Sequence, residues 1–209
     1  MTEYFVPTAV GQAEHVEKRS RFIGRVWPVE TETQALSHIR QTREAHWDAA
    51  HNVYAYILRD GGIMRYSDDG EPQGTGGLPA LGVFRSREIV NVCCVVTRYF
   101  GGTLLGAGGL VRAYSHTAAL AMDAAGIGAV RFWREALLTC TYRQYEWVKK
   151  ELADMGAVLE KTDYGADILI AALVPEDQAE AVRTALADRS AGTVRLELLG
   201  ARPRMVPLR

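Results

Sequence analysis

The stretch RYFGGTLLGAGGLVRAY, Arg98–Tyr114, decides the fold of the first half of the chain. It follows the apolar run Ile89–Val96 and passes into a helical pattern, so we predict a buried strand over 89–99, a glycine loop and a helix over 108–125. Glycine adopts positive φ and lets another backbone approach closely, at an entropic cost. Backbone amides gathered in this way at a helix N-terminus suit an anion.

This stretch contains two arginines, Arg98 and Arg112. Either guanidinium could donate paired hydrogen bonds to the oxygens of a phosphate or a nucleic-acid backbone. The spacing is not that of a P-loop, because no Gly-Lys-Ser/Thr follows, nor is it the Gly-x-Gly-x-x-Gly of a dinucleotide site. The alternative is that the glycines let the helix pack closely on the sheet, with Arg98 paired to Asp68 or Asp69. The predicted anion-binding residues of the stretch are Arg98, Tyr99, Gly101, Gly102, Gly106, Gly108, Gly109 and Arg112.

A second glycine-rich segment, YSDDGEPQGTGGLP at Tyr66–Pro79, carries three carboxylates within four positions. Hard cations bind such oxygens, so a divalent metal is conceivable. The spacing is not that of an EF-hand, and a turn whose Asp side chains bond to nearby backbone amides needs no metal. We predict no metal site, no cofactor and no catalytic residue here, because no base is positioned beside the carboxylates. The candidate residues of this acidic loop are Ser67, Asp68, Asp69 and Glu71.

A short basic strip surrounds Phe22 near the start of the chain, and its cations are Lys18, Arg19, Arg21 and Arg25. Such a strip could contact an RNA backbone while the aromatic ring stacks on a base. A charged edge strand whose apolar residues face the core explains the same residues. Lys18 and Arg21 therefore join the candidate nucleic-acid-binding residues.

The remaining pattern indicates two α+β domains, over 1–135 and 136–200, and a disordered tail over 201–209. The first domain begins with an extended region around Phe22, and Thr31 and Gln34 offer a capping box for a helix. Its further predicted elements are a helix over 31–46, a strand over 52–59 and a short helix over 78–88. The second domain reads as a strand from 136, a helix over 146–155, strands over 157–163 and 167–174, a helix after Pro175 and a strand over 193–199. The order βαββαβ is that of the ferredoxin-like split unit.

Both glycine-rich segments, together with KRSRFI at Lys18–Ile23 and AHNVYAY at Ala50–Tyr56, resemble the signature blocks of the IMPACT/YigZ family. The resemblance covers essentially the whole chain. It implies a link to translational control, with an N-terminal domain like ribosomal-protein and elongation-factor folds and a C-terminal ferredoxin-like elongation-factor module. Eukaryotic members resemble partners of the amino-acid starvation pathway but carry an additional N-terminal domain, so we do not transfer that partnership.

Composition excludes several classes of protein. The 209 residues carry a net charge of −1, so a dedicated DNA-binding domain is not expected. The three cysteines, two of them adjacent, form no disulfide framework and indicate reduced thiols in a cytoplasmic protein. No leader pattern opens the chain and no apolar run spans a membrane.

Three functional hypotheses follow. The first is a non-catalytic binding protein of translation or the stress response that contacts RNA, the ribosome or a translation-associated protein through the two glycine-rich loops. The second is a metal-dependent hydrolase that acts on a phosphate-containing substrate with Asp68, Asp69 or Glu71 and uses Arg98 for electrostatic support. The third is a protein-interaction module.

Overall fold

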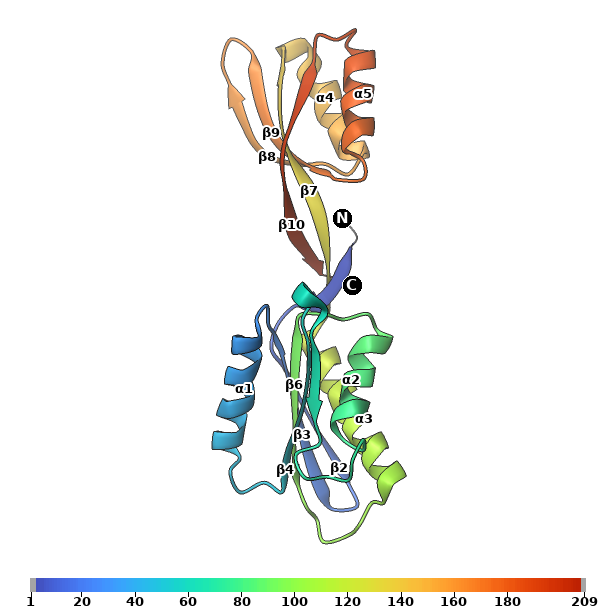
Figure 1. Ribbon diagram of the computed structural model, residues 1–209. Coiled ribbons are helices and arrows are strands. Elements are labelled where there is room, and N and C mark those ends of the chain that lie inside the picture. The colour runs from blue at the N-terminus through green and yellow to red at the C-terminus, as the bar shows by residue number, and fades with distance from the viewer. Residues whose placement is uncertain (1–2, 208–209) are drawn as a thin grey trace. The chain divides into compact units, whose positions relative to one another are not determined.

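The computed structural model describes residues 3–207 and shows a mixed α+β protein (Figure 1). The chain divides into two compact units, Tyr4–Ala129 and Val130–Met205, ahead of the boundary expected after residue 135. The prediction of a two-domain α+β fold is confirmed. In the described residues no helix is both long and apolar enough to span a membrane.

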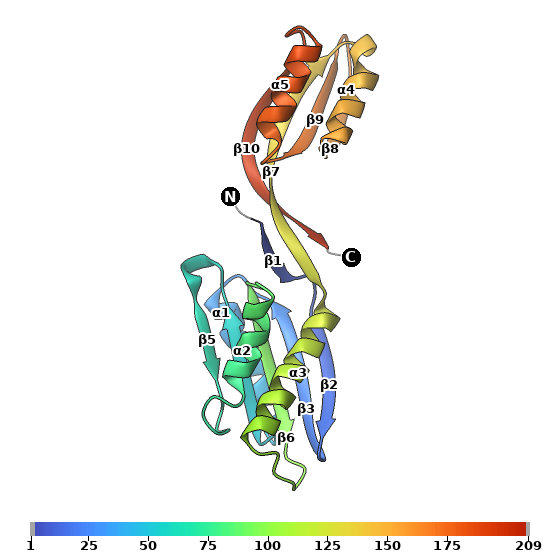
Figure 2. The same cartoon turned by 90° about the vertical axis from the view of Figure 1, so that its right-hand side faces the viewer.

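The N-terminal unit is built on an antiparallel sheet with helices on both faces (Figures 1 and 2). Helix α1 covers one face, and α2 and α3 cover the other. The sheet order is β2 (Gly11–Glu17), β3 (Ser20–Pro28), β6 (Val92–Tyr99), β4 (His51–Ile57) and β5 (Met64–Ser67). The other elements are β1 (Tyr4–Pro7), α1 (Glu32–Ala45), the 3-10 turn η1 (Asp60–Gly62), α2 (Gly77–Ser86) and α3 (Ala107–Ala125).

Local sequence signals account for several of these elements. Thr31 and Gln34 form the predicted capping box at the start of α1. The alternation of β3 points Phe22 and Val26 toward α3, where they join a core with Tyr114 and Met122. Strand β6 is buried along almost its whole length because helices cover both faces of the sheet.

Helix α3 packs closely on the sheet through glycines of the strands below it. A Cβ on Gly11 would lie 2.1 Å from the carbonyl oxygen of Ala121, and one on Gly24 would lie 2.8 Å from that of Thr117. Neither position has room for a side chain. We expected the glycines before and within the helix to allow close packing of α3 on the sheet. The glycines that allow it are instead those of β2 and β3.

The C-terminal unit has the predicted ferredoxin-like arrangement. Strands β7 (Ile127–Cys140), β9 (Ile168–Pro175) and β8 (Val158–Tyr164) are hydrogen-bonded in that order, and β10 (Arg195–Pro207) pairs with β7. Helices α4 (Tyr142–Asp154) and α5 (Ala179–Arg189) cover one face of the sheet (Figure 2). Their apolar sides join the strands in one core that includes Leu152, Leu186 and Ile170.

Two sequence predictions for this unit were wrong. The tail expected over 201–209 is a strand as far as Pro207, because these residues pair with β7; residues 208–209 lie outside the described part of the chain. Helix α4 begins at Tyr142 rather than at residue 146, because Thr141 and Gln144 form a capping box that the sequence reading missed.

The close packing of α3 predicts that Gly11→Ala destabilises the fold by about 1–3 kcal/mol, because the added methyl group would collide with helix backbone. Chemical denaturation measures the change. The control is Gly82→Ala in α2, where a Cβ meets nothing within 4 Å and helix propensity should raise stability by about 0.5–1 kcal/mol. Equal effects of the two substitutions would show that the spacing between helix and sheet does not depend on Gly11.

Candidate functional site

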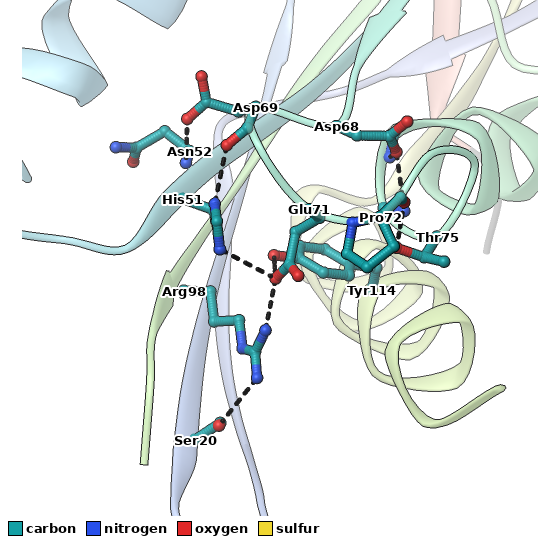
Figure 3. A network of polar contacts seen from close by, with 12 residues as sticks. Ser20, His51, Asn52, Asp68, Asp69, Glu71, Pro72, Thr75, Arg98 and Tyr114 are labelled. Carbon is teal, nitrogen blue, oxygen red and sulfur yellow. Dashed lines mark hydrogen bonds and ion pairs between the residues drawn. The ribbon is translucent and has the colours of Figure 1, made fainter. Parts of the chain in front are cut away.

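A buried carboxylate, Glu71, connects the acidic loop to the rest of the N-terminal unit (Figure 3). Its Oε1 accepts hydrogen bonds from Nη1 of Arg98 at 2.6 Å and from the hydroxyl of Tyr114 at 2.7 Å, and its side chain is only 3% exposed. Arg98 lies on β6 and Tyr114 on α3. One carboxylate therefore fixes a loop, a strand and a helix relative to one another.

The guanidinium of Arg98 reaches further into the same unit. Its Nη2 donates to Oγ of Ser20 at 3.3 Å, and the same oxygen accepts the amide of Gly101 at 3.2 Å. The guanidinium carbon lies 5.5 Å from the ring centroid of Phe22 and 5.4 Å from that of Phe100. Arg98 thereby links the start of β3 to the loop that follows β6.

This arrangement changes the role expected for Arg98. Its partner is Glu71 rather than Asp68 or Asp69, and the side chain is buried, so it anchors the loops and is not exposed to a ligand. Burial, with the Glu71 carboxylate beside it, raises the pKa of Tyr114 far above that of an exposed tyrosine. The phenol consequently stays protonated and donates to Glu71.

The other acidic-loop carboxylates also bind protein groups. Oδ1 of Asp68 accepts the amides of Gly76 and Gly77 at 2.9 and 2.8 Å, and its Oδ2 accepts that of Gly74 at 2.8 Å, which caps the start of α2. The amide of Asp69 donates to Oγ of Ser67 at 3.2 Å. This is the turn stabilised by side chains that the sequence offered as the alternative to a metal site.

Asp69 ties the acidic loop to α1 and β4. Its Oδ1 accepts from Nη2 of Arg43 and its Oδ2 from the amide of Asn52, both at 2.6 Å. Its carbonyl oxygen, which can only accept, lies 2.8 Å from Nδ1 of His51, so that nitrogen carries the proton. Nε2 of His51 is then directed toward Glu71, at 3.8 Å from Oε1. Within residues 3–207 no three His, Cys, Asp or Glu side chains are grouped to hold a metal ion.

The basic strip lies on the hairpin formed by β2 and β3. Lys18 and Arg19 form its two-residue turn with φ of 46° and 68°, and Arg21 is paired with Glu14 at 2.6 Å. Phe22 is completely buried and meets Tyr114 edge to face at 5.2 Å, so it does not stack on a base. The alternative, a strand whose apolar residues face the core, is the one observed, although β3 lies between β2 and β6 and not at the edge of the sheet. Strand alternation turns Phe22 into the core while Arg21 faces the other side of the sheet.

The hairpin turn and the glycine loop after β6 lie at the same end of the sheet (Figure 1). A Cβ on Gly101 would lie 2.0 Å from the carbonyl carbon of Arg19, so the two segments touch through their backbones. We call the surface formed by Lys18–Arg19, Phe100–Gly106 and the first turn of α3 the loop end. Phe100 is 50% exposed there and Leu104 82%. These two side chains were not identified from the sequence. A signal was present, because an apolar residue inside a glycine loop has few core neighbours and is therefore expected to be exposed.

The first turn of α3 completes the loop end. Gly106 precedes the helix with φ of 73° and offers no side-chain cap, and the first turn contains no acidic residue. The first intrahelical bond runs from the amide of Leu110 to the carbonyl of Gly106, so the amides of Gly108 and Gly109 precede it. These are the backbone donors that the glycine pattern predicted at a helix N-terminus.

The remaining candidates lie apart from one another. Tyr99 points to the α1 side, where its hydroxyl bonds to Nδ1 of His46 at 2.8 Å and to Asp48 at 3.2 Å. Gly102 takes positive φ inside the loop. Arg112 lines a hollow with His15 and His116, whereas Asp68, Asp69 and Arg98 belong to the polar network. The four side chains expected around one cleft, Asp68, Asp69, Arg98 and Arg112, are therefore divided between two places.

Breaking the buried pair should destabilise the protein strongly. Glu71→Gln leaves the Arg98 charge buried without a carboxylate, and we expect a loss of about 3–5 kcal/mol in the free energy of unfolding. The matched control is Glu14→Gln, which breaks the exposed pair with Arg21 and should cost at most about 1 kcal/mol. Urea titration of both variants tests this, and similar small losses would contradict the anchoring role of Glu71.

Comparisons with known proteins agree with both units. Residues 18–122 match the family model described as Impact N-terminal domain, and residues 138–193 match a domain of unknown function (DUF1949). "IMPACT family member YvyE" of Bacillus subtilis is 35% identical over 179 residues, which is 85% of this chain and 82% of that protein. "IMPACT family member YigZ" of Escherichia coli is 30% identical over 199 residues, covering 94% of this chain and 98% of that protein.

Two further matches extend the comparison. "Protein IMPACT homolog" of Dictyostelium discoideum is 35% identical over 107 residues, or 48% of this chain and 30% of that protein. A solved structure described as "Crystal structure of an hypothetical protein" is 30% identical, covers 96% of this chain and 98% of its own, and superimposes with a TM-score of 0.60.

Proposed function

This chain belongs to the IMPACT family, and we propose that it is a translation-related binding protein that contacts RNA through the loop end of its N-terminal unit. The family membership, with the similarity to a protein named IMPACT homolog, is consistent with a translation-related regulator. The choice of RNA as the partner comes from the residues of the loop end.

One observation carries this choice, the hairpin turn Lys18–Arg19. Both residues have positive φ, a conformation for which two-residue hairpin turns favour Asn-Gly. Two long cationic side chains are unfavourable there, and among the described residues neither is paired with a carboxylate. Backbone strain of this kind, at a position with two unpaired charges, supports a binding role.

The surroundings of the turn fit a single-stranded nucleic acid. The glycine loop brings its backbone close to the turn, the start of α3 offers amides, and Phe100 presents an exposed ring. Phosphates suit the cations and amides, and a base can stack on an aromatic ring without regard to sequence. Because the net charge is −1, we expect modest affinity rather than the tight binding of a basic domain.

A protein partner is the second candidate, favoured by the exposed apolar side chains of the same unit. Leu104 lies at the loop end, and Trp47, after α1, is 84% exposed beside a hollow that Leu36 also lines. Exposed tryptophan is typical of protein interfaces. The substitution Trp47→Ala separates the two candidates. Because it removes no charge and leaves the loop end intact, it should leave RNA affinity unchanged while weakening the binding of a protein partner.

The turn offers a variant that separates binding from folding. In Lys18→Asn/Arg19→Gly the turn gains its preferred residues, so we expect the unfolding free energy to rise while affinity for single-stranded RNA falls. Loss of two phosphate contacts should lower the salt slope by about 1.4. Fluorescence polarisation with labelled RNA at several salt concentrations, together with thermal unfolding, measures both quantities.

The matched control removes the same charge from the C-terminal unit, as Lys149→Gln/Lys150→Gln on α4. It should leave both the affinity and the salt slope unchanged. A stable Lys18→Asn/Arg19→Gly protein that binds RNA with the original slope would refute the role of the loop end.

A further inference from the structure

A small hollow lies between β2 and the first turns of α3, next to the loop end but separate from the network around Glu71. It has a volume of about 180 Å³ and is lined by His15, Glu17, Gly109, Arg112, Ala113 and His116. The side chain of His15 points from β2 toward the helix, where its ring meets that of His116 edge to face at 4.8 Å between centroids.

Positive and proton-donating groups dominate this hollow. Two imidazoles and the guanidinium of Arg112 face one carboxylate, that of Glu17, which lies 3.9 Å from Nε2 of His15. Arg112 has no carboxylate partner among the described residues. A Cβ on Gly108 would lie 3.7 Å from Nη1 of Arg112, so the guanidinium lies beside the first turn of α3.

The backbone adds to this preference for an anion. Gly109 belongs to the first turn of α3, whose amides precede the first intrahelical hydrogen bond, and no acidic residue of that turn offsets the helix dipole. A cation is disfavoured by Arg112. The two histidines and Glu17 also do not form a metal-holding group within the described residues.

We propose that this hollow binds a terminal phosphate group, carried by an RNA end or by a free phosphomonoester. A phosphate monoester has three unsubstituted oxygens, and these can enter a small hollow and accept hydrogen bonds from Arg112 and the two imidazoles. A diester is substituted on two oxygens and fits such a hollow less well. The proposal rests on the proposed RNA function only for the source of the phosphate. The neighbouring turn, Lys18–Arg19, would contact the chain that follows an RNA end.

The five histidines of the chain provide the readout. Inorganic phosphate is added while chloride keeps the ionic strength constant, and the carbon–proton NMR correlations of the histidine rings are recorded. We expect saturable shifts for His15 and His116. Three histidines outside the hollow serve as internal controls and should not move: His38, His46 and His51. Equal or non-saturable shifts of all five, or none, would overturn the proposal.

Two variants make this test specific. Arg112→Gln should weaken the phosphate effect about tenfold or more, as expected for a lost charged hydrogen bond. Arg65→Gln on β5 removes the same charge far from the hollow along the sheet order and should bind phosphate like the parent protein. An unchanged phosphate affinity in folded Arg112→Gln would refute the site.

The source of the phosphate is tested with three further probes: a nucleoside 5′-monophosphate and one RNA oligonucleotide with a 5′-phosphate or a 5′-hydroxyl. Tighter binding of the phosphorylated RNA supports the hollow as a site for RNA ends. If the monophosphate shifts His15 and His116 while neither oligonucleotide binds, the hollow stands and the RNA function fails. If both oligonucleotides bind equally and leave the two histidines unshifted, the hollow proposal fails and the RNA function stands.

Discussion

The contact on which the N-terminal unit depends is the buried ion pair of Glu71 and Arg98. Removing both charges from water is unfavourable, so the pair contributes only because its geometry is good and further hydrogen bonds support it. Tyr114 donates one of these bonds to Glu71, and Ser20 accepts one from the other end of the guanidinium. Loss of either member of the pair leaves the other charge buried without compensation. The pair therefore fixes where the acidic loop, β6 and α3 meet.

The aspartates of the acidic loop also bind groups of the protein itself. Asp68 binds three backbone amides and Asp69 binds Arg43 and the amide of Asn52, so their oxygens already hold partners. Glycine-rich segments have little side-chain packing of their own, and polar anchors take its place. Lys18, Arg19 and Arg112 have no carboxylate partner among the described residues, and they lie outside this network.

Sequence periodicity sufficed for the fold but not for the partners of individual side chains. The order βαββαβ and the strand, loop and helix around Arg98–Tyr114 follow from period and glycine signals, and both are present. Period alone does not say which face of β3 is covered, so the sequence left two roles open for Phe22, stacking on a base or packing in the core. The partner of Arg98 was sought among the aspartates, although the longer Glu71 is the one that reaches it. Pro203 and Pro207 suggested a tail, yet proline is tolerated in β10 because that strand lies at the edge of its sheet.

Positive φ values at residues other than glycine have different explanations in this chain, and the contrast points to function. Asp69 has φ of 47°, but aspartate tolerates this region and its carboxylate and carbonyl oxygens are all bonded. Lys18 and Arg19 have comparable φ values without such bonds, and the two-residue turn that they form would be more stable as Asn-Gly. Folding therefore accounts for Asp69 but not for Lys18 and Arg19. Their strain has no counterpart in the contacts of the fold, and the proposed binding role of their charges offers an explanation for it.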